Sequence, residues 1–209
     1  MHTVEVMNEL DKKNKGKLEV VCGPMFSGKS EELMRRLRRA KIARQHIIIF
    51  KPTIDTRYIA DNIVSHDGNS LNAFPVKDAQ ELLSVVVNNN ATVIGIDEAQ
   101  FFDIGIVDTI CELIESGKRV IVAGLDLDYR GIPFGPMPLL LAIADQITKL
   151  QAICNTCGHD AHFTQRIVNN KPAPFEDEVV KVGGQESYQA RCRTCHVIDK
   201  RVLFSQLPR

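Results

Sequence analysis

The sequence contains no tryptophan, few aromatic residues and no net charge. Aromatic residues make up 6% of the 209 positions, and 26 basic residues balance 26 acidic residues. Because generic nucleic-acid binding uses a basic surface, a neutral chain gives no sign of that function at the whole-chain level. One local basic run, from Arg35 to Lys41, is interpreted as the solvated face of a helix. We therefore expect no nucleic-acid partner.

Long apolar runs are also missing. No stretch approaches the roughly 18 consecutive apolar residues that suggest a membrane-spanning helix. We do not expect residues 1–17 to act as a signal peptide, because Glu5, Glu9 and Asp11 interrupt any apolar run. There is no internal repeat and no low-complexity tract. We expect a cytoplasmic protein without a membrane partner, with residues 1–17 as a flexible N-terminal extension.

Short apolar segments alternate with helical patterns through the first three quarters of the chain. Strands that are apolar throughout and alternate with helices indicate a parallel sheet covered on both faces. The sequence thus predicts an α/β domain over residues 18–150. The expected strands are 18–22, 47–50, 71–76, 92–96, 119–124 and 147–153, and the expected helices are 30–44, 78–87, 104–115 and 138–144.

The segment from Gly23 to Ser30 fits the phosphate-loop pattern G-x-x-x-x-G-K-[ST]. Glycines let the backbone turn so tightly that its N–H groups point at phosphate oxygens. The helix expected after the loop directs its positive end at the same anion. Lys29 would reach the β- and γ-phosphates, and the Ser30 hydroxyl would ligate Mg²⁺. Because it lies between an expected strand and an expected helix, this segment predicts an ATP-binding loop.

Two carboxylates follow the expected strand 92–96, in the sequence Asp97-Glu98-Ala99-Gln100. Ligands of open α/β sheets gather at the carboxyl ends of the strands. Asp97 is thereby placed to hold Mg²⁺, directly or through water. Glu98 is placed as a general base, for an acceptor hydroxyl or for water. The same four residues also suit an ATPase motor, so they do not decide the reaction.

Composition changes near Cys154, which predicts a second, zinc-binding domain over residues 151–209. Two C-x-x-C pairs, 34 residues apart, are typical of structural Zn²⁺ held by four thiolates. His159 and His196 are either substitute ligands or solvated loop histidines, and a redox role for a cysteine pair is the weaker alternative. The four expected ligands are Cys154, Cys157, Cys192 and Cys195.

The long insertion between the pairs contains Gly183, Gly184 and Tyr188. Insertions beyond roughly 15 residues are usually functional or disordered. Glycines allow close backbone approach, and Tyr188 offers a ring and a hydroxyl. A lid over a planar ligand is one interpretation, and a hairpin that only supports the metal is the other.

These motifs together resemble thymidine kinase of the cellular, zinc-containing type (type II). The resemblance covers Lys17 to Cys195 and rests on the phosphate loop, Asp-Glu-Ala-Gln-Phe-Phe at 97–102, the cysteine pairs and the pattern around Gly184, Glu186 and Tyr188. It implies a P-loop, RecA-like parallel sheet with helices on both faces. It also implies a small zinc domain whose lasso loop, about residues 163–190, closes the nucleoside site.

The resemblance implies transfer of the ATP γ-phosphoryl group to the 5′-hydroxyl of thymidine, with Glu98 as the base. It further implies deoxyuridine as a second substrate, thymidine triphosphate as feedback inhibitor, and a homotetramer. Implied ATP- and phosphate-binding residues are Gly23, Pro24, Met25, Phe26, Ser27, Gly28, Lys29, Ser30, Asp97, Gln100, Asp55 and Arg57, with Ser30 and Asp97 on Mg²⁺. Implied nucleoside-site residues are Met25, Phe101, Leu125, Tyr129, Thr164, Val179, Val180, Lys181, Val182, Gly183 and Tyr188.

Two positions depart from the family pattern. Some bacterial relatives place histidine where Cys195 stands, and here His196 follows directly, so the fourth zinc ligand is open between them. Tyr129 stands where other members carry phenylalanine, and its hydroxyl offers an extra polar contact. Besides a nucleoside kinase, the motifs also suit a nucleic-acid-stimulated ATPase or a zinc-dependent module that only binds nucleotide. The neutral charge disfavours the ATPase, and the binding module leaves Glu98 unexplained.

Overall fold

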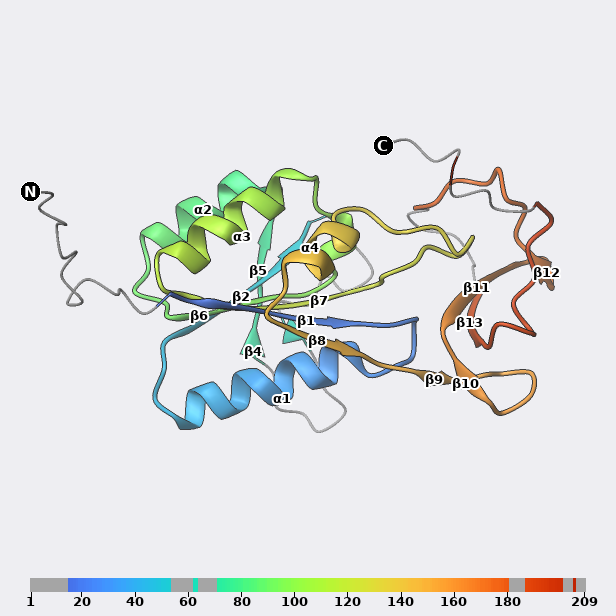
Figure 1. The fold of residues 1–209 in the computed structure, drawn as a ribbon, viewed down its shortest axis with the longest axis horizontal. Helices are drawn as coiled ribbons and strands as arrows, with labels where there is room; N and C mark the ends of the chain where they lie inside the picture. Colours follow the sequence, from blue (N-terminus) through green and yellow to red (C-terminus); the bar gives the residue numbers. More distant parts are fainter. Residues whose placement is uncertain (1–14, 54–61, 64–70, 181–186, 201–204, 206–209) are drawn as a thin grey trace, which may run out of the picture.

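A six-stranded, wholly parallel sheet forms the centre of the molecule (Figure 1). The computed structural model describes residues 15–53, 62–63, 71–180, 187–200 and 205. The strand order is β5-β2-β6-β7-β1-β8. The strands are β1 (Lys17–Cys22), β2 (Ile47–Pro52), β5 (Phe74–Val76), β6 (Val93–Ile96), β7 (Arg119–Gly124) and β8 (Gln146–Lys149).

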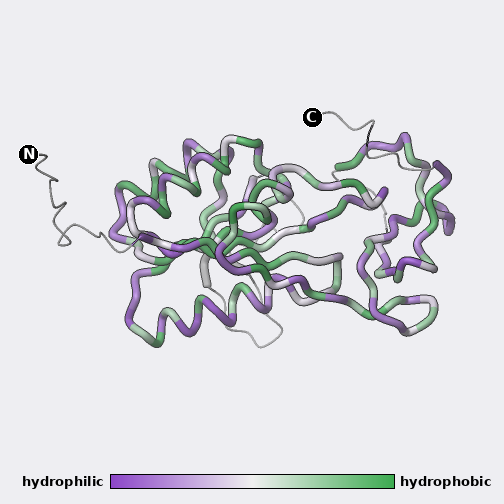
Figure 2. The backbone as a smooth tube through the Cα atoms, viewed as in Figure 1, coloured by the Kyte–Doolittle hydropathy of each residue, from purple (hydrophilic) through white to green (hydrophobic). Residues whose placement is uncertain are grey.

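Helices cover both faces of this sheet (Figure 1). The helix α1 (Lys29–Ile42) lies on one face, and α2 (Ala79–Val87), α3 (Gly105–Glu115) and α4 (Met137–Ile143) lie on the other. Successive side chains of β1 pack on opposite faces of the sheet. Val20 and Cys22 belong to the core under α2 and α3, and Val21 belongs to the core under α1. Hydrophobic residues accordingly concentrate along the central strands (Figure 2). The predicted parallel sheet with two covered faces is confirmed.

Two predicted strands are each divided. Within 71–76, β4 (Leu71–Asn72) pairs with β3 (Asn62–Ile63), and only β5 joins the central sheet. Within 147–153, β8 ends at Lys149, where the amide of Leu150 donates to the Cys22 carbonyl as the last contact with β1. The chain then leaves the sheet and forms β9 (Ala152–Ile153).

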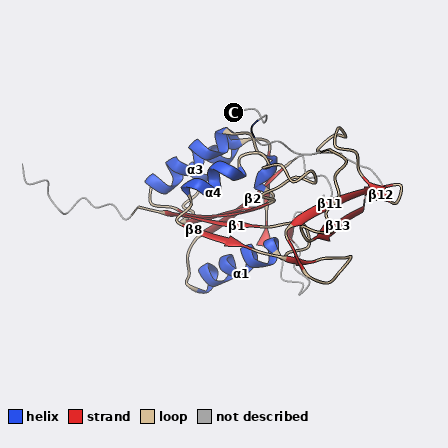
Figure 3. Cartoon of the chain, turned by 45° about the vertical axis from the view of Figure 1, so that its right-hand side comes forward, coloured by secondary structure: helices blue, strands red, loops and turns tan. Residues whose placement is uncertain are grey.

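Residues 152–180 and 187–200 form a smaller, antiparallel lobe beside the main sheet (Figure 3). In it β9 pairs with β10 (Asp160–Ala161), and β11 (Phe163–Val168) lies between β12 (Lys171–Pro172) and β13 (Ser187–Arg191). Asn169 and Asn170 join β11 to β12 with positive φ angles of 49° and 61°. Asparagine tolerates this left-handed backbone better than most residues, and such two-residue turns match the twist of a hairpin.

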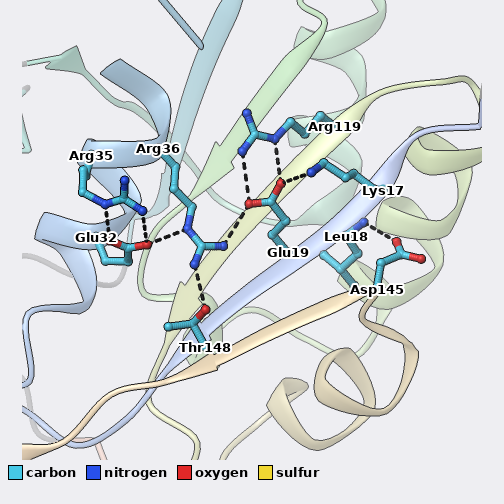
Figure 4. A network of polar contacts seen from close by, with 9 residues as sticks. All are labelled: Lys17, Leu18, Glu19, Glu32, Arg35, Arg36, Arg119, Asp145 and Thr148. Atoms are coloured by element: carbon cyan, nitrogen blue, oxygen red, sulfur yellow. Dashed lines mark hydrogen bonds and ion pairs between the residues drawn. The ribbon is translucent and has the colours of Figure 1, made fainter. Parts of the chain in front are cut away.

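A buried ion-pair network lies on the α1 face of the sheet (Figure 4). The Glu19 carboxylate of β1 accepts hydrogen bonds from Arg36 of α1 at 2.9 Å and from Arg119 of β7 at 2.7 Å. Lys17 lies 2.7 Å from the same carboxylate, and Arg36 also donates to the Thr148 hydroxyl of β8. The network joins α1 to three strands, and α1 and β1 are the two elements that flank the phosphate loop.

Within the described ranges, none of the helices is long and apolar enough to cross a membrane.

Candidate active site and metal centre

The phosphate loop connects β1 to α1 in the predicted place. Gly23 has φ 143°, and a Cβ there would lie 2.4 Å from the Leu150 carbonyl oxygen. Gly28 has φ 81° and caps the N-terminus of α1. Both positions therefore need glycine, the first for close approach to Leu150, which follows β8, and the second for a left-handed turn. The first-turn N–H groups of α1 open toward the loop, as an anion site requires.

Lys29 bends back over the loop. Its ammonium group donates to the Pro24 carbonyl oxygen at 2.8 Å, and the Ser27 hydroxyl donates to the same oxygen at 2.8 Å. Burial lowers the pKa of Lys29, and the negative charges of Glu98 and Asp97 act against that shift. The lysine and both carboxylates therefore share one site, which brings together residues that are about 70 positions apart in sequence.

Asp97 follows β6 and is 7% exposed. Its carboxylate accepts from the Glu98 amide at 3.0 Å. Burial and the nearby charge of Glu98 raise the pKa of Asp97 to about 7, against the hydrogen bond from the Ser30 side chain. A buried carboxylate beside a hydroxyl is a pair of hard oxygen donors, which is the ligand type that Mg²⁺ prefers. Ser30 and Asp97 therefore fit the predicted cation.

Glu98 holds a strained backbone. Its φ and ψ are 52° and 41°, the left-handed region that costs a residue with a Cβ about 1–2 kcal/mol. It directly precedes the short helix η3 (Ala99–Phe101). Strain of this kind is found disproportionately at functional sites. The conformation turns the chain sharply at the strand end, directly after Asp97.

Gln100 fixes the Glu98 side chain. The Gln100 amide nitrogen donates to the Glu98 carboxylate at 2.5 Å, and its amide oxygen accepts from the Leu125 N–H at 2.9 Å. With 2% exposure, the side chain lies between these two partners. Both ends of the Gln100 amide thus orient protein groups, and phosphate binding by Gln100 stays a prediction.

The smaller lobe contacts the phosphate loop through Thr164 of β11. The Met25 amide donates to the Thr164 hydroxyl at 3.0 Å. In the β11–β13 pairing Arg166 lies opposite Tyr188, and Thr164 is two residues before Arg166, so these three share one face of the lobe. Tyr129 lies against the same face, with its ring centroid 5.3 Å from the Arg166 guanidinium. The structure thus gathers four of the predicted nucleoside-site residues, Met25, Thr164, Tyr129 and Tyr188.

The other predicted nucleoside-site residues are divided between described and undescribed parts of the chain. Phe101 packs edge-on against Phe134 with centroids 5.7 Å apart, and Leu125 bonds to Gln100 as above. Val179 is partly buried and Val180 is 37% exposed. Asp55, Arg57, Lys181, Val182 and Gly183 lie outside the described residues.

Asp126 was missed by sequence reasoning, although it follows β7 as Asp97 follows β6. It is 6% exposed and forms an ion pair of 2.8 Å with Lys149 at the end of β8. Its other carboxylate oxygen is buried without a hydrogen-bond partner among the described residues. Burial, followed by the charge of Asp126, raises the pKa of the neighbouring Cys22 thiol to about 11. The signal was available, since two acids follow β7 in the sequence Leu125-Asp126-Leu127-Asp128.

The four paired cysteines form a cluster with the geometry of a metal site. Their sulfur atoms all lie within 4.8 Å of one another, and Cys157 Sγ is 3.6 Å from Cys192 Sγ. Zinc bonds of about 2.3 Å in a tetrahedron place sulfurs about 3.8 Å apart, so the cluster fits Zn²⁺. All six cysteines of the chain are free thiols, and Gly158, at φ 76°, turns the first pair. The cluster consists of Cys154, Cys157, Cys192 and Cys195.

Neither histidine replaces a cysteine in this cluster. The His196 ring stacks on Phe163 with centroids 4.7 Å apart, and its Nε2 lies 2.9 Å from the Tyr129 carbonyl oxygen. Burial lowers the pKa of His196, so a neutral ring that donates to this carbonyl is favoured. His159 Nδ1 lies 3.4 Å from Cys157 Sγ, where it contacts a ligand and not the metal position. Of the two candidates for the fourth ligand, Cys195 is the one that lies in the cluster.

The comparison with protein families agrees with this arrangement. A family model described as thymidine kinase matches residues 16–196, which span the central sheet, the phosphate loop and all four clustered cysteines.

Proposed function

This chain belongs to the thymidine kinase family, and from that premise we propose that it transfers the γ-phosphoryl group of ATP to the 5′-hydroxyl of thymidine with Glu98 as the general base. The observation that carries the proposal is the meeting of Lys29, Asp97 and Glu98 at one end of the sheet. A phosphate loop alone accounts for nucleotide binding. A strained, oriented carboxylate beside it adds a proton acceptor, which transfer to a hydroxyl requires.

The donor half of the site is the phosphate loop. Its N–H groups and the start of α1 bind the triphosphate, and Lys29 moves from the Pro24 carbonyl to the β- and γ-phosphates. Mg²⁺, held by Ser30 and Asp97, neutralises charge on the phosphates when it is bound. The Ser30 hydroxyl is already hydrogen-bonded to the Asp97 carboxyl, which supports this assignment. Asp55 and Arg57 are assigned to the same half by sequence alone.

The acceptor half lies between the loop and the smaller lobe. The Met25–Thr164 hydrogen bond joins these two parts, so a nucleoside bound there lies next to the phosphate loop. We assign the nucleoside contacts to Phe101, Leu125, Tyr129, Val179, Val180 and Tyr188, together with Met25 and Thr164. The assignment of Lys181, Val182 and Gly183 rests on sequence.

Glu98 removes the proton of the 5′-hydroxyl as that oxygen attacks the γ-phosphorus. The new P–O bond forms while the bond to the β-phosphate oxygen breaks, and ADP leaves with the electron pair. Gln100 holds the Glu98 carboxylate in place during this step. Orientation of this kind lowers the barrier because the base does not have to be positioned during the reaction.

Three further features belong to the proposal through the family. Deoxyuridine is a second acceptor, thymidine triphosphate is an end-product inhibitor that occupies the same site, and the active form is a homotetramer. The smaller lobe takes one structural Zn²⁺, which supports the face that carries Thr164 and Tyr188.

The Glu98→Gln variant tests the proposed base. Glutamine keeps the size of the side chain and loses the proton acceptor, so kcat should fall by about 10²–10⁴ while ATP binding is nearly unchanged. Kinetics with MgATP and thymidine, and calorimetric titration with ATP, measure the two quantities. Glu115→Gln, an exposed change at the end of α3, is the control. Wild-type turnover in Glu98→Gln would remove Glu98 from the role of base.

A further inference from the structure

Tyr129 lies in the turn after β7 and carries a polar group that the proposed reaction does not use. The side chain is buried, with 3% exposure. Its hydroxyl lies 2.9 Å from the carbonyl oxygens of both Pro174 and Asp177, and 3.3 Å from that of Phe175. A phenol has one proton to donate, and here three carbonyl oxygens converge on it. The hydroxyl is therefore directed at the main chain of residues 174–177.

Arg166 of β11 contacts the same segment from a second direction. It is fully buried, and its two terminal nitrogens donate to the Glu178 carbonyl oxygen at 2.5 Å and to the Asp177 carboxylate at 3.0 Å. Its guanidinium also lies over the Tyr129 ring, 5.3 Å from the centroid. The two side chains thus contact one another and share one target, the main chain of residues 174–178.

The other contacts of the segment lie nearer the surface. Inside the segment, the Asp177 amide donates to the Pro174 carbonyl at 3.2 Å, and the Glu178 amide donates to the Asp177 carboxylate at 3.1 Å. From outside, the exposed Asp199 accepts from the Phe175 amide, Lys200 pairs with Glu176 at 2.6 Å, and the Arg130 and Lys200 cations lie over the Phe175 ring. The segment has no strand pairing within the described residues. A segment without regular secondary structure takes its position from side-chain hydrogen bonds, and buried donors such as these specify it most strongly. Val179 and Val180 follow directly.

We propose that Tyr129 and Arg166 are positioning residues for the acceptor site, which fix the main chain of residues 174–178 and so set the place of Val179 and Val180 against the nucleoside. This inference rests on the proposed function, because it takes the nucleoside contacts of Val179 and Val180 from it. It adds a specific use for the Tyr129 hydroxyl. The Tyr129 ring packs against Arg166, and the Tyr129 hydroxyl binds the main chain of residues 174–177 and not the nucleoside.

The Tyr129→Phe variant removes only this hydroxyl. One lost hydrogen bond to the segment should raise KM for thymidine about 5–10-fold. kcat and KM for ATP should stay within twofold of wild type, because no group on the donor half changes. Arg166→Lys, which keeps the charge but not the two-pronged geometry, should change KM for thymidine in the same direction. Ser84→Ala on α2 is the control, since it removes an exposed hydroxyl-to-carbonyl bond far from the site.

Amide hydrogen exchange supplies a readout independent of activity. In Tyr129→Phe, amides of residues 175–180 should exchange faster, and those of β1 and β7 should not change. Thymidine KM and exchange rates equal to wild type in Tyr129→Phe would overturn the inference. So would a loss of thermal stability with unchanged kinetics, because that outcome assigns the hydroxyl to folding alone. Absence of thymidine phosphorylation by the wild-type protein would instead end the proposed function, and the exchange data would still report on the segment.

Discussion

Replacement of Glu19 by glutamine should destabilise the protein by an amount that depends on pH. Glu19 is the buried acid of the ion-pair network on the α1 face, with Arg36, Arg119 and Lys17 around it (Figure 4). Glutamine has the same shape, but it leaves these cations without the opposite charge. Removal of one partner of a buried ion pair is strongly destabilising, because the remaining charge stays buried.

The size of the effect follows from the pKa of Glu19. Burial alone would raise this pKa, but hydrogen bonds from Arg119 and Lys17 outweigh burial and hold the pKa at about 2, below the ordinary 4.5. That difference corresponds to roughly 3 kcal/mol of free energy of unfolding. Because the folded-state pKa is depressed, this contribution is complete above about pH 4.5 and is lost as the pH falls toward 2. A loss of this size leaves a domain of ordinary stability folded at neutral pH.

Urea unfolding between pH 7 and pH 3 measures the prediction. At pH 7 the midpoint of Glu19→Gln should lie well below that of the wild type, and the two free energies should converge as the pH falls below 4.5. Glu112→Gln, an exposed change on α3, is the control and should match the wild type throughout. Equal stability of Glu19→Gln and wild type at pH 7, or a difference that does not shrink in acid, would refute the reasoning.

Two further predictions concern the metal centre and the turn beside Glu98. The purified protein should contain about one Zn per chain by elemental analysis. The Cys157→Ser variant should lose this metal and have a Tm lower by about 10 °C or more, whereas the control Cys111→Ser on α3 should keep it. A metal-free protein with normal Tm and activity would contradict this prediction. Gly135→Ala should cost about 1–3 kcal/mol and reduce kcat, since Gly135 has φ 51° and a Cβ there would lie 2.3 Å from the Gln100 carbonyl oxygen. Gly158→Ala shares the positive φ but meets no atom within 4 Å, so equal kinetic losses in both variants would rule out the contact with Gln100 as the cause.

Local sequence patterns predicted the features of this fold that depend on neighbouring residues. The phosphate loop and the paired cysteines are short motifs whose chemistry is fixed by spacing, and both lie where they were expected. The helices and strands of the main sheet follow hydrophobic periodicity, so their order along the chain was predictable. The ends of the strands were less predictable from sequence, because the break after Lys149 depends on where the partner strand β1 ends.

The interactions that complete the site join residues far apart in sequence. The bond from Met25 to Thr164, the pair of Asp126 with Lys149, and the contact of Tyr129 with residues 174–177 span from about 20 to about 140 positions. No periodicity or spacing encodes such pairs, since they depend on how the smaller lobe packs on the sheet. The left-handed backbone of Glu98 was equally hidden, because a non-glycine residue adopts it only where the surrounding fold enforces it.

Transfer of labelled phosphate tests the central claim most directly. The protein is incubated with Mg²⁺, thymidine and ATP that carries the label on its γ-phosphate, in the absence of nucleic acid, and the products are separated by chromatography. The account predicts label in thymidine monophosphate, in an amount equal to the ADP formed. Release of label only as inorganic phosphate, or ATP consumption that requires added DNA or RNA, would contradict it.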